Sequence, residues 1–177
     1  VMEKLYEVTG GNAIVTSDGG QHQMWAAQYY KFDEPRRWLN SGGLGTMGVG
    51  LPYAMGAALQ HPEMQIACVT GEGSIQMCIQ ELSTCKQYGL PVKIINLNNG
   101  MLGMVRQWQE LFFEKRYSEI DLSDNPDFTA LAAAFGVQAL HVERAADVED
   151  ALQALLDAPG PALLHVAIDP KANVWPL

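Results

Sequence analysis

The fold of this chain is decided by one stretch, Gln65-Ile66-Ala67-Cys68-Val69-Thr70-Gly71-Glu72-Gly73-Ser74. Its first six residues are largely apolar and are followed by glycines, which predicts a buried strand that ends at a tight turn. From Ser74 to about residue 88, apolar residues recur every three or four positions, and this spacing predicts a helix with one face against a sheet. The stretch therefore begins a strand–helix unit with Glu72 at the carboxyl end of its strand.

A second apolar strand is expected at residues 92–97, and it is followed by Asn98 and Asn99. Because the carboxyl ends of parallel strands meet at one edge of a sheet, Glu72 and Asn99 are expected to lie close together. Their oxygens suit Mg²⁺, whose coordination is often completed by phosphate oxygens, and the glycines beside Glu72 allow close approach to the backbone. Each piece alone could be an ordinary turn, but their joint spacing favours a metal-and-diphosphate site.

Strands and helices alternate along the rest of the chain. Further strands are expected at residues 14–17, 138–142 and 162–168. Further helices are expected at residues 21–30, 51–60, 103–113, 128–135 and 146–156. This alternation predicts an α/β fold, a doubly wound, mostly parallel sheet with helices on both faces.

Length and composition narrow the function classes. A chain of 177 residues, 48% of them hydrophobic, can bury one α/β core, so residues 1–177 are expected to form a single domain. The net charge of −9 argues against binding to nucleic acid or to an anionic membrane. Neither a signal peptide nor an apolar run of spanning length is recognisable, so we expect a soluble, cytoplasmic protein. Because residue 1 is Val and not Met, we also expect a piece of a longer, multi-domain polypeptide.

The three cysteines form no CxxC pair, are odd in number and fall on apolar faces. This pattern favours buried free thiols in a reducing compartment over a disulfide or a zinc site. The cysteines are Cys68, Cys78 and Cys85.

Several longer motifs point to one family. They are Gly20–Ala26 (GQHQMWA), Pro35–Trp38 (PRRW), Ser41–Gly48 (SGGLGTMG), Met104–Gln109 (MVRQWQ) and Val174–Leu177 (VWPL). Through these motifs nearly the whole chain resembles the carboxyl-terminal thiamine diphosphate (ThDP)-binding domain of the acetohydroxyacid synthase, or acetolactate synthase, large catalytic subunit. The resemblance implies the ThDP-binding fold of the diphosphate-binding module.

The resemblance also implies a role for individual positions. Mg²⁺ would be bound by the Glu72 carboxylate, the Asn99 amide oxygen and the Met101 carbonyl, with two cofactor phosphates completing the octahedron. Met104 and Trp108, one helical turn apart, would line the pocket for the second 2-keto acid. The implied cofactor-binding residues are Gln21, His22, Gly45, Met47, Gly73, Ser74, Leu102, Gly103 and Met104.

Four of these positions also have ordinary structural interpretations. His22 could be a satisfied polar residue at the start of a helix, and Met47 a core residue that fills a gap. Met104 and Trp108 could equally contribute to core packing. In the family, the Met47 position supports the bent cofactor, which brings the aminopyrimidine amine near the thiazolium carbon.

The implied reaction is the decarboxylation of pyruvate and transfer of the two-carbon unit to pyruvate or 2-ketobutyrate, on the way to branched-chain amino acids. The carboxylate that activates the cofactor would come from the amino-terminal domain of a neighbouring subunit, and most of the FAD site from a middle domain. Expected partners are these two domains, a second large subunit in a homodimer or higher oligomer, and a small regulatory subunit. The chain therefore contains no complete catalytic set and is expected to be inactive alone.

Two residues depart from the family pattern. Glu72 stands where Asp is usual, and the extra methylene lengthens the side chain by about 1.5 Å. Mg²⁺ requires its ligand oxygens at about 2.0–2.1 Å. We expect Glu72 to bind the ion nevertheless, because its charge and its spacing to Asn99 are retained. Cys78 stands where Asn is usual, and we interpret this as a change in packing.

Three alternative functions remain open from the sequence. Residues 43–48 fit the GxGxxG pattern of a dinucleotide-binding module with Glu72 as the ribose acid, but residues 36–41 are too polar and short for the buried strand that should precede it. A second alternative is another ThDP enzyme of the pyruvate oxidase or glyoxylate carboligase type, against which Trp108 argues. The third is a non-enzymatic scaffold with a degenerate metal site, which Glu72 and Cys78 would explain.

Overall fold

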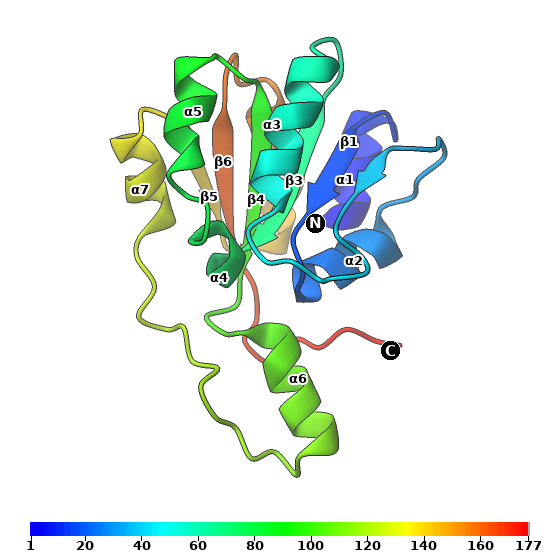
Figure 1. Ribbon diagram of the computed structural model, residues 1–177, viewed down its shortest axis with the longest axis vertical. Coiled ribbons are helices and arrows are strands. Elements are labelled where there is room, and N and C mark those ends of the chain that lie inside the picture. The colour runs from blue at the N-terminus through cyan, green and yellow to red at the C-terminus, as the bar shows by residue number, and fades with distance from the viewer. Residues whose placement is uncertain (177) are drawn as a thin grey trace.

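The computed structural model describes residues 1–176, which form one parallel six-stranded sheet with the strand order β2-β1-β3-β4-β6-β5 (Figure 1). The central strands β3 and β4 are buried along almost their whole length, as expected for strands covered on both faces. The strands are β1 (Ile14–Ser17), β2 (Trp38–Leu39), β3 (Ile66–Gly71), β4 (Val92–Asn98), β5 (Gln138–Val142) and β6 (Ala162–Ala167).

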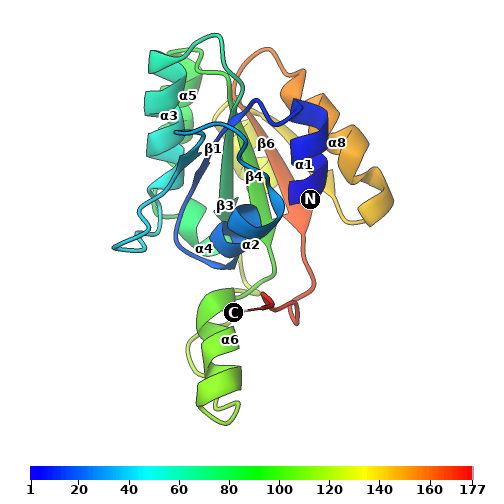
Figure 2. The ribbon, with the colours of Figure 1, turned by 90° about the vertical axis from the view of Figure 1, so that its right-hand side faces the viewer.

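Helices cover both faces of the sheet, as predicted (Figure 2). Each face has its own apolar core. Helices α1, α2 and α8 pack on one face, and α3, α4, α5 and α7 pack on the other. Neighbouring residues of β4 face opposite cores, with Ile95 on the first face and Ile94 on the second. The helices are α1 (Met2–Thr9), α2 (Gln21–Tyr29), α3 (Gly50–Gln60), α4 (Glu72–Ile75), α5 (Glu81–Gln87), α6 (Gly103–Phe112), α7 (Phe128–Ala134) and α8 (Val148–Leu156), the last preceded by the 3₁₀ turn η1 (Ala145–Asp147).

The expected single helix from residue 74 to 88 is wrong, because it is divided into α4 and α5. The segment between them is held by tighter hydrogen bonds three residues apart, from Met77 N to Ser74 O at 3.1 Å and from Leu82 N to Ile79 O at 3.1 Å. This segment places Cys78 in the same apolar core as the buried residues of α3, and Cys78 does not line the cavity of the site described below. All three cysteines are free and buried, as predicted.

Two elements were not predicted from the sequence. Helix α1 buries Met2, Leu5 and Thr9, which follow the helical spacing. Strand β2 is only two half-buried residues long and pairs with β1 at the edge of the sheet. Residues 36–41 therefore provide an edge strand and not the buried strand that a dinucleotide-binding unit requires.

Helix α6 differs from the other helices because it extends beyond the carboxyl edge of the sheet (Figures 1 and 2). The carboxyl-terminal segment after β6 runs beside it. None of the helices within residues 1–176 combines the length and the apolar character needed to cross a membrane.

Candidate functional site

A cavity of about 290 Å³ opens at the carboxyl ends of β1, β3 and β4. In the sheet, β2 lies next to β1 on one side, whereas β3 and then β4 follow on the other side of β1. The direction in which strands are added therefore reverses between β1 and β3. Ligands of open α/β sheets bind in the crevice at such a switch point. Of the site residues predicted from the sequence, the structure brings these to the cavity wall: Gln21, His22, Gly45, Met47, Glu72, Gly73, Ser74, Asn99, Met101, Leu102, Gly103 and Met104.

The two side chains expected to bind a metal converge on one backbone group. The Met101 N–H lies 2.8 Å from Glu72 Oε1 and 3.2 Å from Asn99 Oδ1. The loop that carries Met101 is itself fixed, because Leu102 N donates to Ile120 O at 2.8 Å and Leu122 N donates to Gly100 O at 2.8 Å. A carboxylate oxygen and an amide oxygen are thus held side by side above strands β3 and β4.

The environment of Glu72 suits a bound cation. Its side chain is buried, and burial raises the pKa of its carboxyl group, while backbone hydrogen bonds, including that from Met101, oppose the rise. Within residues 1–176 there is no cluster of three or more His, Cys, Asp or Glu side chains that could hold a metal ion. A metal here would therefore need further oxygen ligands from a cofactor, which is the usual arrangement for Mg²⁺.

Two buried polar atoms of residues that share the cavity wall with Glu72 have no hydrogen-bond partner within residues 1–176, namely His22 Nε2 and Ser74 Oγ. Both residues line the cavity. Burial lowers the pKa of His22 to about 4, so its imidazole is neutral at pH 7. Buried polar groups are normally paired, so this neutral ring and this hydroxyl are suited to meet the oxygens of a bound diphosphate.

Glycines make the space for these side chains. A Cβ atom on Gly71 would lie 2.7 Å from His22 Nδ1, and a Cβ on Gly20 would meet the same ring. A Cβ on Gly103 would lie 2.6 Å from Asn99 Nδ2 and would also meet Gln21. Glycine at these positions lets the polar side chains pack directly against the backbone.

The loop that carries Gly45 and Met47 is tied to the end of β1. Gly19 N donates to Thr46 O at 3.1 Å, and Gly50 N donates to Asp18 Oδ1 at 2.5 Å. Asp18 is buried and also accepts a hydrogen bond from Thr70 Oγ1. Burial raises the pKa of Asp18, and these hydrogen bonds oppose the rise. Asp18 was not predicted from the sequence, although its position directly after a buried strand could have marked it.

The two predicted substrate-pocket residues behave differently. Met104 lines the cavity, whereas Trp108 does not and is 54% exposed on α6. The Trp108 ring meets only Phe112 among aromatic neighbours, edge to face at 6.2 Å. Its role at the second 2-keto acid remains a prediction. Gly71, one of the two glycines that flank Glu72, also lines the cavity. The cavity residues that the sequence did not reveal are Gly19, Gly20, Gln23, Trp25, Leu97 and Val105.

Comparison with known proteins agrees with this geometry. Residues 18–166 match the family described as thiamine pyrophosphate enzyme, C-terminal TPP binding domain, and the match contains the whole cavity. The chain belongs to this family. Thiamine pyrophosphate is another name for ThDP, so the assignment supports the ThDP interpretation over the dinucleotide alternative.

The relatives of the chain include acetolactate synthases. The chain is 51% identical over its full length to the acetolactate synthase isozyme 2 large subunit of Escherichia coli and 49% identical to the isozyme 3 large subunit. It is 47% identical to an acetolactate synthase of Mycobacterium bovis. The full chain covers 32%, 31% and 29% of these proteins, respectively, so it spans about a third of the length of the curated relatives that it matches. These relatives confirm the predicted resemblance.

Proposed function

We propose that this chain is the ThDP- and Mg²⁺-binding domain of an acetolactate synthase large subunit. The observation that carries the proposal is the pairing of Glu72 and Asn99 around the Met101 N–H, at the wall of a cavity in a ThDP-binding family domain. The chain is 51% and 49% identical, over its own full length, to two acetolactate synthase large subunits, which supports acetolactate synthase over other ThDP enzymes.

Each part of the cavity then has a task. Glu72, Asn99 and the Met101 carbonyl hold Mg²⁺, and His22 and Ser74 meet the diphosphate. Gly45 and Met47 hold the aminopyrimidine half of the cofactor, and Gln21, Gly73, Leu102 and Gly103 complete the binding surface. When bound, ThDP supplies the nucleophilic carbon and the electron sink for decarboxylating a 2-keto acid.

The remaining roles concern the substrates and partners. Met104 and Trp108 border the second substrate, pyruvate or 2-ketobutyrate. The complete enzyme adds an amino-terminal and a middle domain with FAD, a second large subunit and a small regulatory subunit, and it works in the cytoplasm in the synthesis of branched-chain amino acids. The support is that the chain covers only about a third of the length of relatives that are named as large subunits.

Calorimetry tests the cofactor assignment. Titration of ThDP into the 177-residue chain should give saturable binding with Mg²⁺ present and none after the metal is chelated, because the cavity lining within residues 1–176 contains no Lys or Arg to neutralise the diphosphate. NAD serves as the control and should not bind. Metal-independent ThDP binding, or preference for NAD, would contradict the proposal.

The same chain should form no acetolactate from pyruvate, even with ThDP and Mg²⁺. The reason is that the carboxylate that activates the cofactor is expected from another domain. Measurable acetolactate formation by the purified 177-residue chain would overturn this part of the proposal.

A further inference from the structure

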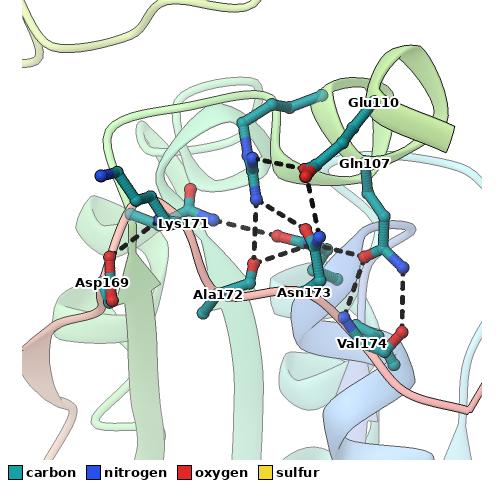
Figure 3. A network of polar contacts seen from close by, with 10 residues as sticks. Gln107, Glu110, Asp169, Lys171, Ala172, Asn173 and Val174 are labelled. Atoms are coloured by element: carbon teal, nitrogen blue, oxygen red, sulfur yellow. Dashed lines mark hydrogen bonds and ion pairs between the residues drawn. The ribbon is translucent and has the colours of Figure 1, made fainter. Parts of the chain in front are cut away.

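A row of side-chain amides connects Asn99 to the carboxyl-terminal segment. Asn99 Nδ2 lies 3.0 Å from Gln21 Oε1, and Gln21 Nε2 lies 2.8 Å from Gln107 Oε1. Gln107, on α6, reaches the backbone of Val174 with both ends of its amide, at 2.9 Å each (Figure 3). Asn99, Gln21, Gln107 and Val174 are all buried, so water does not compete for these hydrogen bonds.

The backbone of Val174 fixes the direction of the row. A carbonyl oxygen can only accept and a backbone N–H can only donate. Gln107 must therefore turn its NH₂ group to the Val174 carbonyl and its oxygen to the Val174 N–H. The same oxygen is then the group presented to Gln21.

The direction passes on to Asn99. Because Gln107 presents an acceptor, Gln21 turns its NH₂ group towards Gln107 and its oxygen towards Asn99. Asn99 then donates through Nδ2, and its Oδ1 accepts from the Met101 N–H, which also donates to Glu72. The Met101 N–H favours the same orientation, but its shorter hydrogen bond goes to Glu72. The amide oxygen, which is the only end of Asn99 able to bind a cation, thus points to the metal position.

We propose that Gln107 is a positioning residue that, through Gln21, orients the Asn99 amide for metal binding. The proposal rests on the proposed function, since it takes Asn99 as a ligand of Mg²⁺. It explains why α6, which lies outside the sheet, buries a glutamine that contacts no apolar core. It also gives the carboxyl-terminal segment a task at the cofactor site.

Helix α6 offers a matched control two residues further on. Gln109 Oε1 accepts from Ser118 N at 3.0 Å, and Gln109 Nε2 donates to Ser118 O at 3.1 Å. Gln109 therefore pairs with the backbone of one residue as Gln107 does, but its two hydrogen bonds are exposed, and none of its described hydrogen bonds goes to Gln21 or Asn99. Substitution of Gln109 removes a comparable pair of hydrogen bonds at a more exposed place on the same helix, without interrupting the row of amides.

The first test compares Mg²⁺-dependent ThDP binding by calorimetry in three variants, each checked for folding by thermal unfolding. Gln107→Met removes the nearer acceptor of Gln21 Nε2, at 2.8 Å, and leaves only the Ala172 carbonyl at 3.3 Å. It should weaken metal affinity about 10- to 100-fold, the usual effect of losing a partner that orients a metal ligand. Gln107→Glu keeps an acceptor for Gln21 and should lose less. Gln109→Met should bind as the unaltered chain does.

A purely structural role for Gln107 predicts the opposite order. Burying a carboxylate beside the Val174 carbonyl is more unfavourable than burying a methionine of similar shape, so Gln107→Glu would then be the more damaged variant. Weaker binding by Gln107→Glu than by Gln107→Met, or equal losses in Gln107→Met and Gln109→Met, would overturn the proposal.

A second measurement needs neither metal nor cofactor. In the metal-free chain, the Asn99 side-chain NH₂ protons should exchange slowly with solvent in nuclear magnetic resonance spectra. This protection should be lost in Gln107→Met and retained in Gln109→Met, even if Gln107→Glu does not fold. Unchanged Asn99 exchange in Gln107→Met would refute the row of amides itself. If the exchange responds to the variants as expected but the unaltered chain shows no Mg²⁺-dependent ThDP binding, the row of amides stands and the proposed function is refuted.

Discussion

Glu72 and Asn99 are positioned by the sheet, whereas Gln107 is positioned by a helix outside it. Strands β3 and β4 pair in register from Ile66 opposite Val92 to Gly71 opposite Leu97, so the residues that follow them must lie together. Helix α6 has no such ladder and is held beside the cavity by side-chain hydrogen bonds to the carboxyl-terminal segment, including Asn173 Nδ2 to Glu110 Oε2 at 3.2 Å (Figure 3). The site therefore combines two halves. One is a rigid half fixed by the pairing of β3 and β4, and the other, on α6, depends on polar contacts between distant parts of the chain.

The largest effect is expected from the sheet. Ile95 lies fully buried on β4, and Ile95→Ala should lower the free energy of unfolding by about 2–5 kcal/mol because it leaves a cavity between strand and helices. Denaturant titration measures this change. Ile95→Val is the control and should lose only about 0.5–1.5 kcal/mol. Equal losses in the two variants would show that the sheet is not the rigid half.

A smaller effect is expected from pH at the cavity wall. Burial lowers the pKa of His22 from its ordinary value of 6.5 to about 4, so the unfolded chain binds a proton that the folded chain does not. The neutral His22 therefore contributes about 3 kcal/mol to the free energy of unfolding above pH 6.5, and this contribution is lost as pH falls towards 4.

The measurement compares the unfolding free energies of the parent chain and of His22→Gln across this pH range. Because the glutamine does not titrate, the free energy of unfolding of the parent chain should fall by about 3 kcal/mol relative to that of His22→Gln as the pH falls from 6.5 towards 4. A constant difference would contradict the buried neutral state of His22.

The smallest effect on stability is expected on the outer face of α6. Trp108 is 54% exposed, and its main aromatic contact is the exposed Phe112, so Trp108→Ala should change the free energy of unfolding by about 1 kcal/mol or less. The same denaturant titration provides the value. A loss as large as that of Ile95→Ala would mean that α6 is as tightly packed as the sheet.

The rigid half could be predicted from the sequence because its signals are local. The apolar runs that became β3 and β4 define two neighbouring strands, and parallel pairing then dictates that Glu72 and Asn99 meet. The division of the helix after Ser74 could not be predicted, because the apolar spacing continues through the segment where tighter turns replace regular helix. Strand β2 escaped prediction because two half-buried residues carry almost no periodic signal.

The half that depends on α6 was only partly predictable. The helix itself follows from its spacing, but the partners of Gln107 lie 86 residues before it and 67 residues after it in the chain. No pattern within a helix indicates that a glutamine will be buried against such distant groups. The ring of Trp108 was expected at a pocket on family grounds, and its exposure on α6 reflects how far this helix extends beyond the sheet.

The central claim is that Glu72 is a metal ligand, and thermal unfolding of Glu72→Gln at pH 7 tests it most directly. Because burial raises the pKa of Glu72 above 4.5, its contribution to stability is present below that pH and is lost as pH rises through the raised pKa. Without metal, Glu72→Gln should therefore unfold at a higher temperature than the parent chain. Added Mg²⁺ and ThDP should raise the unfolding temperature of the parent chain and leave that of Glu72→Gln nearly unchanged. An equal rise in both chains would contradict the account.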